Sequence, residues 1–223
     1  MTYYLLLTSL KLIIMKNLKV YFLVIAALFI GVNASAQNEV NLGVKAGVNL
    51  SNFGGDGVED ADSKVGFSIG ATLDYGLTES LFLLTGLDFT TKGAKGKFDD
   101  DDDDFEISIN PMYLQIPVHA GYKLNMANDA KLVISAGPYV AYGLGGKVKS
   151  DFDGVSVSTD FFGDEDKGAI AKRFDFGVGL GVGYEFSKFK IGVGYDFGLA
   201  NVSNDKDYKV RTQNGYLTFG YKF

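Results

Sequence analysis

The segment 174–186, FDFGVGLGVGYEF, alternates with a strict period of two, and this pattern constrains the fold more than any other feature of the chain. Large apolar residues occupy every even position, while glycine, aspartate or glutamate occupies every odd one. After Ser187-Lys188 the apolar residues move to the odd positions of the segment 189–199. Alternation on both sides of a two-residue turn predicts an antiparallel β-hairpin. One face of this hairpin is apolar, and the other combines glycine with charged residues.

The same alternation recurs along the chain, and the apolar runs together predict eight strands. The strand at 81–92 is less regular than the others, because Phe82 and Leu84 fall on its polar side. We expect the eight strands at about 40–50, 64–75, 81–92, 107–124, 130–147, 174–186, 189–199 and 211–223.

The connections between these strands alternate between short and long. Outer-membrane barrels have an even number of antiparallel strands, short periplasmic turns and longer external loops. The pattern therefore predicts an up-and-down barrel whose first and last strands both end in the periplasm. Short turns are expected at 76–80, 125–129 and 187–188, and long, polar loops at 51–63, 93–106, 148–172 and 200–210.

Aromatic residues on the apolar face gather near the strand ends and leave an aliphatic band between them. Two aromatic girdles around such a band are typical of the lipid-facing surface of a barrel. We therefore predict an all-β fold, an eight-stranded antiparallel up-and-down transmembrane β-barrel in the outer membrane of a Gram-negative cell. The residues near the short turns are Tyr75, Tyr122, Tyr184, Phe186, Phe189, Tyr221 and Phe223, and those near the long loops are Phe89, Tyr142, Phe174 and Phe197.

The alternative is a soluble, lipocalin-like barrel that binds an apolar ligand, which also has eight antiparallel strands. Alternation alone does not distinguish the inside of a barrel from the outside. In this alternative the aromatic face fills the cavity and the glycine-rich face meets water. It leaves the aromatic clustering unexplained and exposes many glycines, which are weak strand formers.

The polar face of the strands supplies charges of both signs to the interior. A ring of eight strands is narrow enough for side chains to fill it. We expect a solvated network of salt bridges in the lumen, with neither an open pore nor an acid–base pair for catalysis. The residues assigned to this network are Lys45, Asp74, Asp88, Lys92, Lys123, Asp175, Glu185, Lys190, Asp196 and Lys222.

The first 36 residues have the layout of a secretory signal peptide. A basic start at 15–19 precedes an apolar run at 20–32, and the sequence Ala34-Ser35-Ala36 precedes Gln37. We expect cleavage between Ala36 and Gln37.

This assignment divides the chain into a signal peptide, 1–36, and a barrel domain, 37–223. Residues 1–14 are also apolar, and together with the run at 20–32 they could form one long membrane anchor. The preferred interpretation is a spurious extension upstream of the true start at Met15. The signal peptide carries three lysines and no acid, so its removal changes the net charge from −6 to −9.

Composition excludes several classes of function. An acidic exported protein lacks the basic surface that nucleic-acid binding requires. The chain has no cysteine, which excludes disulfides, zinc–thiolate sites and thiol nucleophiles. Its one histidine, His119, has no second histidine or cysteine to complete a metal site, and a triad built on it has little support. We predict no catalysis and no cofactor, with His119 as a lumen residue that has a polar partner.

Six consecutive aspartates, Asp99 to Asp104, lie in the second long loop. Calcium takes six to eight oxygen ligands, which makes Asp99, Asp101 and Asp103 weak candidates for a calcium site. A bare run lacks the spaced ligands and the turn glycine of such a site, and like charges favour disorder. We therefore expect a solvated external loop.

Pro117 and Pro138 do not fit the strand pattern. Proline removes a hydrogen-bond donor, so a central strand should exclude it. The turn at 125–129 makes these two residues near neighbours across a strand pair, and we expect a β-bulge or a local break in the ladder there.

Several segments resemble the PorT-like outer-membrane β-barrel family. They are 113–118 (YLQIPV), 136–142 (AGPYVAY), 174–186, 191–199, Thr91-Lys92-Gly93 and the aromatic C-terminus 220–223 (GYKF). The resemblance implies an integral protein in contact with outer-membrane lipid and inserted by the barrel-assembly machinery, with Tyr221 and Phe223 as the C-terminal assembly signal. It implies no catalytic residues. The family's namesake is linked to protein secretion, which adds a secretion-associated role to the structural and binding roles expected for this chain, with secretion-system or surface partners.

Overall fold

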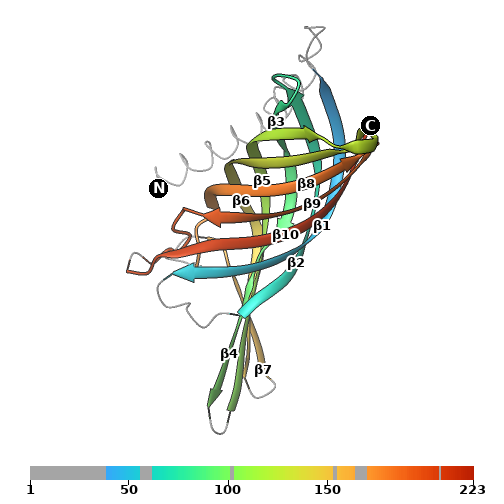
Figure 1. Cartoon of the computed structure of the whole chain (residues 1–223). Helices are drawn as coiled ribbons and strands as arrows, with labels where there is room; N and C mark the ends of the chain where they lie inside the picture. The colour runs from blue at the N-terminus through green and yellow to red at the C-terminus, as the bar shows by residue number, and fades with distance from the viewer. Residues whose placement is uncertain (1–38, 56–61, 101–102, 153–154, 164–169, 206) are drawn as a thin grey trace, which may run out of the picture. The chain divides into compact units, whose positions relative to one another are not determined.

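The computed structural model describes residues 39–55, 62–100, 103–152, 155–163, 170–205 and 207–223 (Figure 1). Glu39–Phe223 forms one compact unit. The predicted signal peptide, its cleavage site at Ala36 and Gln37, and the extension 1–14 lie outside the described residues. Within the described residues, no helix is both long enough and apolar enough to cross a membrane.

The described residues of this unit form ten strands and one short 3-10 helix, η2 (Ala127–Asp129). The strands are β1 (Val40–Gly55), β2 (Asp62–Gly76), β3 (Leu81–Thr91), β4 (Ala94–Asp100), β5 (Asp103–Asn125), β6 (Lys131–Phe152), β7 (Val155–Asp160), β8 (Phe174–Phe186), β9 (Phe189–Gly198) and β10 (Val210–Lys222).

Eight of these strands form a closed antiparallel ring in the order β1-β2-β3-β5-β6-β8-β9-β10. The ring closes where β1 pairs with β10, from Gly43↔Lys222 to Gly55↔Val210. The closed eight-stranded barrel predicted from the alternation is therefore confirmed. A closed sheet leaves no edge with unpaired backbone groups, which hydrocarbon could not satisfy.

The remaining strands, β4 and β7, lengthen the ring on one side into a four-stranded extension, β4-β5-β6-β7, which projects beyond the other strands in Figure 1. We call the end of the barrel that bears it the long-loop end, and the opposite end the short-turn end. The prediction that 93–106 and 148–172 are loops is wrong for much of their length. The backbone pairs Asp99↔Asp104 and Asp100↔Asp103 continue the hairpin to its tip, because strand pairing satisfies the backbone even where the side chains are alike in charge.

The apolar face of the strands points outward. Along β8 every inward residue alternates with an exposed apolar one: Asp175 is fully buried, while Leu180 is 52% exposed. The same holds around the ring, where Val44, Ile69, Ile134, Val193 and Phe219 are all exposed. A soluble barrel with an apolar ligand requires the reverse arrangement, so the structure overturns that alternative.

Aromatic side chains form a continuous belt at the short-turn end of β8, β9 and β10. The Phe189 ring centroid lies 5.6 Å from that of Phe186 and 5.5 Å from that of Tyr221, and Tyr221 lies 5.9 Å from Phe223. At the long-loop end, the rings of Tyr195 and Phe197 are 4.5 Å apart. Outward aromatic side chains are therefore present near both ends of the wall, as predicted, and they form a continuous belt at the short-turn end.

Each of the two prolines interrupts one ladder. The β3–β5 register omits Pro117, whose carbonyl accepts a hydrogen bond from the Thr85 hydroxyl at 2.7 Å. The β5–β6 register omits Pro138, although Pro138 still pairs with Val178 of β8. The predicted local break is confirmed, and the register shift of this strand pair lies elsewhere, between Met112 and Tyr113.

Candidate functional site

The lumen contains the ten charged residues that the alternation assigned to it, five lysines and five carboxylates. Each takes part in an ion pair or hydrogen bond with another lumen residue. These residues come from different positions along the strands, so they lie at different depths in the lumen. Asp175 and Glu185 are ten residues apart on β8, which corresponds to roughly 33 Å along a strand. The polar contacts therefore form successive layers along the barrel.

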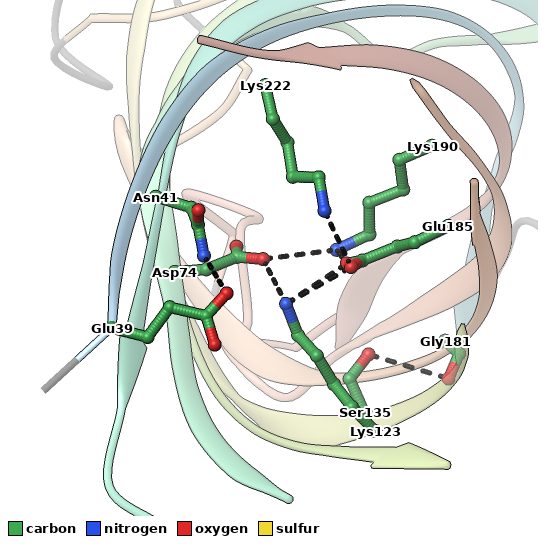
Figure 2. Close-up of polar contacts among 9 residues, drawn as sticks. All are labelled: Glu39, Asn41, Asp74, Lys123, Ser135, Gly181, Glu185, Lys190 and Lys222. Carbon is green, nitrogen blue, oxygen red and sulfur yellow. Dashed lines mark hydrogen bonds and ion pairs between the residues drawn. The ribbon is translucent and has the colours of Figure 1, made fainter. Parts of the chain in front are cut away.

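The layer nearest the short-turn end is a lysine–carboxylate cluster of Asp74, Lys123, Glu185, Lys190 and Lys222 (Figure 2). Lys123 Nζ lies 2.8 Å from an Asp74 oxygen and 3.2 Å from a Glu185 oxygen. Glu185 also pairs with Lys190 at 3.3 Å and with Lys222 at 3.0 Å. Three lysines facing two carboxylates give this layer a net charge of +1.

Two apolar residues of β3 support this cluster from within the barrel. Phe82 is fully buried, and Lys123 Nζ lies 4.1 Å from its ring centroid, a cation–π contact. Leu84 fills the space left by Gly121, where a Cβ would lie 2.4 Å from Leu84 Cδ1. The irregularity of this strand in the sequence therefore marks two side chains that pack inside the lumen.

The middle of the lumen is a polar chamber of about 140 Å³. Lys45 Nζ pairs with Asp88 at 2.8 Å, and Gln115 Nε2 donates to Asp196 at 2.9 Å. Among the described residues that line the chamber, five buried polar atoms have no hydrogen-bond partner: Asn49 Oδ1, Asp88 Oδ1, Gln115 Oε1, His119 Nε2 and Asn214 Oδ1. Buried polar groups are normally hydrogen-bonded, so the chamber has the size and polarity to hold ordered water.

His119 faces this chamber, as predicted, but no polar partner for its Nε2 is present among the described residues. Gly179 makes room for it: a Cβ there would lie 2.8 Å from His119 Nε2 and 2.7 Å from Asp196 Oδ1. A histidine beside a carboxylate is a possible acid–base pair. The described residues above it, however, close the chamber toward the long-loop end.

This closure begins with a buried ion pair between Lys92 and Asp175, 3.3 Å apart, whose side chains are 1% and 0% exposed. Asp175 also accepts hydrogen bonds from Thr212 at 2.8 Å and from Tyr139 at 3.4 Å. Lys92 Nζ lies between two rings, 4.7 Å from the centroid of Tyr139 and 5.1 Å from that of Tyr113. All five side chains are buried inside the barrel at this depth.

An apolar cap covers this ion pair at the long-loop end. Phe162, which follows β7, meets Tyr113 edge-on with centroids 5.3 Å apart, and Phe161 packs 5.9 Å from Phe53 of β1. Ala171 and Val202 complete the cap, and both are almost fully buried. This cap could not be predicted from the sequence, because Phe161 and Phe162 belong to a connection without alternation and their contacts depend on the closed ring.

The other predicted site residues lie away from the lumen. Asp99 and Asp103 belong to the tip of the β4–β5 hairpin, and Asp101 lies outside the described residues. Among described residues, no group of three or more histidines and carboxylates is placed to hold a metal ion. Phe223 is 72% exposed and its amide donates to the Leu42 carbonyl at 2.9 Å, so it is on the outer wall beside β1.

A family model described as "Outer membrane protein beta-barrel domain" matches residues 35–204. The chain belongs to this outer-membrane β-barrel family. The protein is accordingly located in the outer membrane, with the apolar wall of its barrel in contact with lipid. No curated protein matches the chain.

Solved outer-membrane barrels are similar to this chain at low sequence identity. Neisserial surface protein A (NspA) is 16% identical, with a TM-score of 0.43, and the alignment covers 83% of this chain and 99% of that one. Ail, the attachment invasion locus protein of Yersinia pestis, is 17% identical with a TM-score of 0.41 and the same coverage. OprG from Pseudomonas aeruginosa is 13% identical with a TM-score of 0.39, covering 83% of this chain and 95% of that one.

Proposed function

We propose that this outer-membrane barrel is a non-catalytic scaffold with a closed lumen, which presents its β4–β7 extension outside the cell to bind a surface partner. The observation that carries this proposal is the combination of a filled barrel with strands that continue past it. Ion pairs and the apolar cap occupy the lumen, while β5 and β6 run on from the ring into the extension (Figure 1). Such a molecule is suited to presenting a surface rather than to transport.

The proposed orientation follows from the connections. Barrels of this class keep short turns in the periplasm and long connections outside. The short-turn end bears the turns around η2 and Ser187-Lys188 and also the first and last residues of the ring. The long-loop end would then be external, and the aspartate run would give the extension an acidic tip. A binding partner with a basic surface fits this charge.

Processing and assembly complete the proposal. Cleavage between Ala36 and Gln37 would release a barrel domain, 37–223, from the signal peptide and from residues 1–14. Tyr221 and Phe223 would be read by the barrel-assembly machinery during insertion. A calcium ion at Asp99, Asp101 and Asp103 is not needed for this role.

A secretion-associated role, as the PorT-like resemblance implies, is the finer form of the same proposal. It requires the extension or the short-turn end to contact a secretion system. Deleting the gene and comparing the proteins released into the medium tests it directly. Unchanged secretion would contradict the secretion-associated role and would not affect the scaffold role.

The chain contains no cysteine, which allows the orientation and the closed lumen to be tested with single-cysteine variants. Val157→Cys lies on β7, where the native side chain is 60% exposed, and Asn128→Cys lies in η2 at the opposite end. On intact cells a membrane-impermeant maleimide should label the first variant and not the second, while both react after lysis. The opposite pattern would reverse the orientation, and a steady ion conductance of the wild-type protein in planar bilayers would contradict the closed lumen.

A further inference from the structure

A groove of about 380 Å³ lies on the outer wall at the long-loop end, over β1, β9 and β10. Arg211 and Gln213 line it from β10, where they alternate with Thr212 and Asn214, which are buried in the lumen. The groove is therefore on the outside of the barrel, on the same face as the lipid-facing residues.

The side chains that line the groove combine hydrogen-bond donors with apolar surface. Arg211 and Lys209 are exposed cations, and no acidic side chain among the described residues lines the groove. Phe197 and Leu199, 43% and 49% exposed, form its apolar side. The exposed acids Asp205 and Asp207 belong to the loop that precedes Lys209 but are not part of the lining.

Two glycines of β1 create the floor of the groove. Gly54 pairs with Arg211, and a Cβ at this position would lie 2.5 Å from Gln213 Nε2. Gly55 has a φ of +128°, and a Cβ there would lie 1.8 Å from the Lys209 carbonyl oxygen. The Gln213 amide is held by Tyr195, whose hydroxyl donates to Gln213 Oε1 at 3.0 Å. This bond leaves Gln213 Nε2 as a donor over Gly54.

A further glycine, Gly215, lies in the lipid-facing wall close to the groove but outside its lining. Gly215 lies two residues along β10 and pairs with Leu50 on one side and Tyr195 on the other. A Cβ at Gly215 would come no closer than 3.6 Å to any neighbouring atom. Gly215 therefore adds no side chain to the outer wall between Leu50 and Tyr195, on the same face of β10 as the exposed Leu217.

We propose that this groove binds a lipid of the adjoining leaflet through its phosphate-bearing headgroup. Arg211, Lys209 and Gln213 Nε2 supply donors for phosphate oxygens, since guanidinium and ammonium groups form strong charge-assisted hydrogen bonds to phosphate. Gly215 gives an acyl chain a path down the wall between Leu50 and Tyr195. The choice of lipid A as the ligand rests on the proposed external orientation of the long-loop end, but the site does not depend on the binding role proposed for the extension.

The test uses the full-length protein, extracted from membranes in detergent, with native mass spectrometry to count bound lipid. Diphosphoryl lipid A and dioleoylphosphatidylcholine are the two lipid probes, and inorganic phosphate in excess is the competitor. The wild-type protein should retain lipid A in preference to phosphatidylcholine. Lys209→Gln/Arg211→Gln should weaken lipid A binding by about tenfold or more, because each hydrogen bond to a charged group contributes a factor of about ten or greater.

The matched control is Lys147→Gln/Lys149→Gln, which removes the same charge from two exposed positions of β6 outside the groove. It should bind lipid A as the wild type does. Gly54→Val keeps both cations but displaces the Gln213 amide, and it should also weaken binding. Heat-modifiable gel mobility establishes that each variant is folded.

Three results would overturn the proposal. If the control and groove variants lost lipid A affinity equally, overall charge and not the groove would explain the binding. Wild-type affinity in Lys209→Gln/Arg211→Gln would remove the groove as the site. Complete displacement of lipid A by inorganic phosphate would show that the groove recognises the phosphate anion alone, with no contribution from the rest of the lipid.

Discussion

The buried pair Lys92–Asp175 offers the sharpest test of how the lumen is held together. At 3.3 Å and an effective dielectric constant of about 20, the attraction between the two charges is about 5 kcal/mol. Removing both charges from water offsets much of this attraction. Removing only one charge, however, leaves its partner buried and uncompensated, which typically costs about 3–5 kcal/mol.

We expect Lys92→Met to lower the free energy of unfolding by about 3 kcal/mol, the lower end of that range. Asp175 would keep its hydrogen bonds from Thr212 and Tyr139, which soften the loss. Asp175→Asn should cost about 4–5 kcal/mol, because Lys92 would lose its counter-charge and be left with a neutral amide and the rings of Tyr113 and Tyr139. The double variant has neither charge, and its free energy of unfolding should lie within about 2 kcal/mol of the wild-type value.

The measurement is a double-mutant cycle by urea unfolding in phosphatidylcholine vesicles. Circular dichroism reports the loss of the sheet, and gel mobility reports the folded fraction independently. The reasoning is refuted if Lys92→Met costs under about 1 kcal/mol, the range of exposed pairs, or if the two single losses simply add in the double variant.

Three further predictions concern other parts of the barrel. Lys123→Met should cost clearly less than Lys92→Met in the same urea assay, because Glu185 retains Lys190 and Lys222; an equal or larger cost would contradict the shared cluster. Val193→Arg places a cation on the lipid-facing wall and should cost about 2–4 kcal/mol near the midplane, whereas Val193→Leu should be nearly neutral; tolerance of arginine would argue against lipid contact. Phe162→Ala should cost about 3–5 kcal/mol as a large-to-small change in the buried cap, and its unfolding midpoint would remain at the wild-type value if the cap contributed nothing.

Period-two alternation was sufficient to predict the ring, because the two faces of a strand in a membrane barrel meet opposite environments. The residues of β8 show this directly. The odd positions of Asp175 and Glu185 in the alternating segment are enough to assign both to the lumen, and both are buried there. Parity also explains why Phe82 looked misplaced in the sequence. It is an inward residue that packs beneath Lys123.

The extension and the cap could not be predicted in the same way. The segment that contains Asp99 to Asp104 looks like a solvated loop, because charge runs normally favour disorder, yet the backbone pairing of β4 with β5 reaches Asp100↔Asp103. The cap joins Phe53 to the adjacent residues Phe161 and Phe162, which lie far from Phe53 in the chain and show no periodic relation to it. The order in which charges pair across the lumen is likewise set by strand register, which alternation does not specify.

The seam between β1 and β10 has a consequence for how the barrel forms. Each pair along it joins residues more than 150 positions apart, such as Gly55 and Val210. Contacts between the two ends of a chain cost the most loop entropy and slow folding. Until the last strand has emerged, β1 has an unpaired edge that invites association with another chain. Insertion therefore requires the complete polypeptide. A truncation that removes β10 would leave an open sheet, whose unpaired edges a bilayer cannot accommodate.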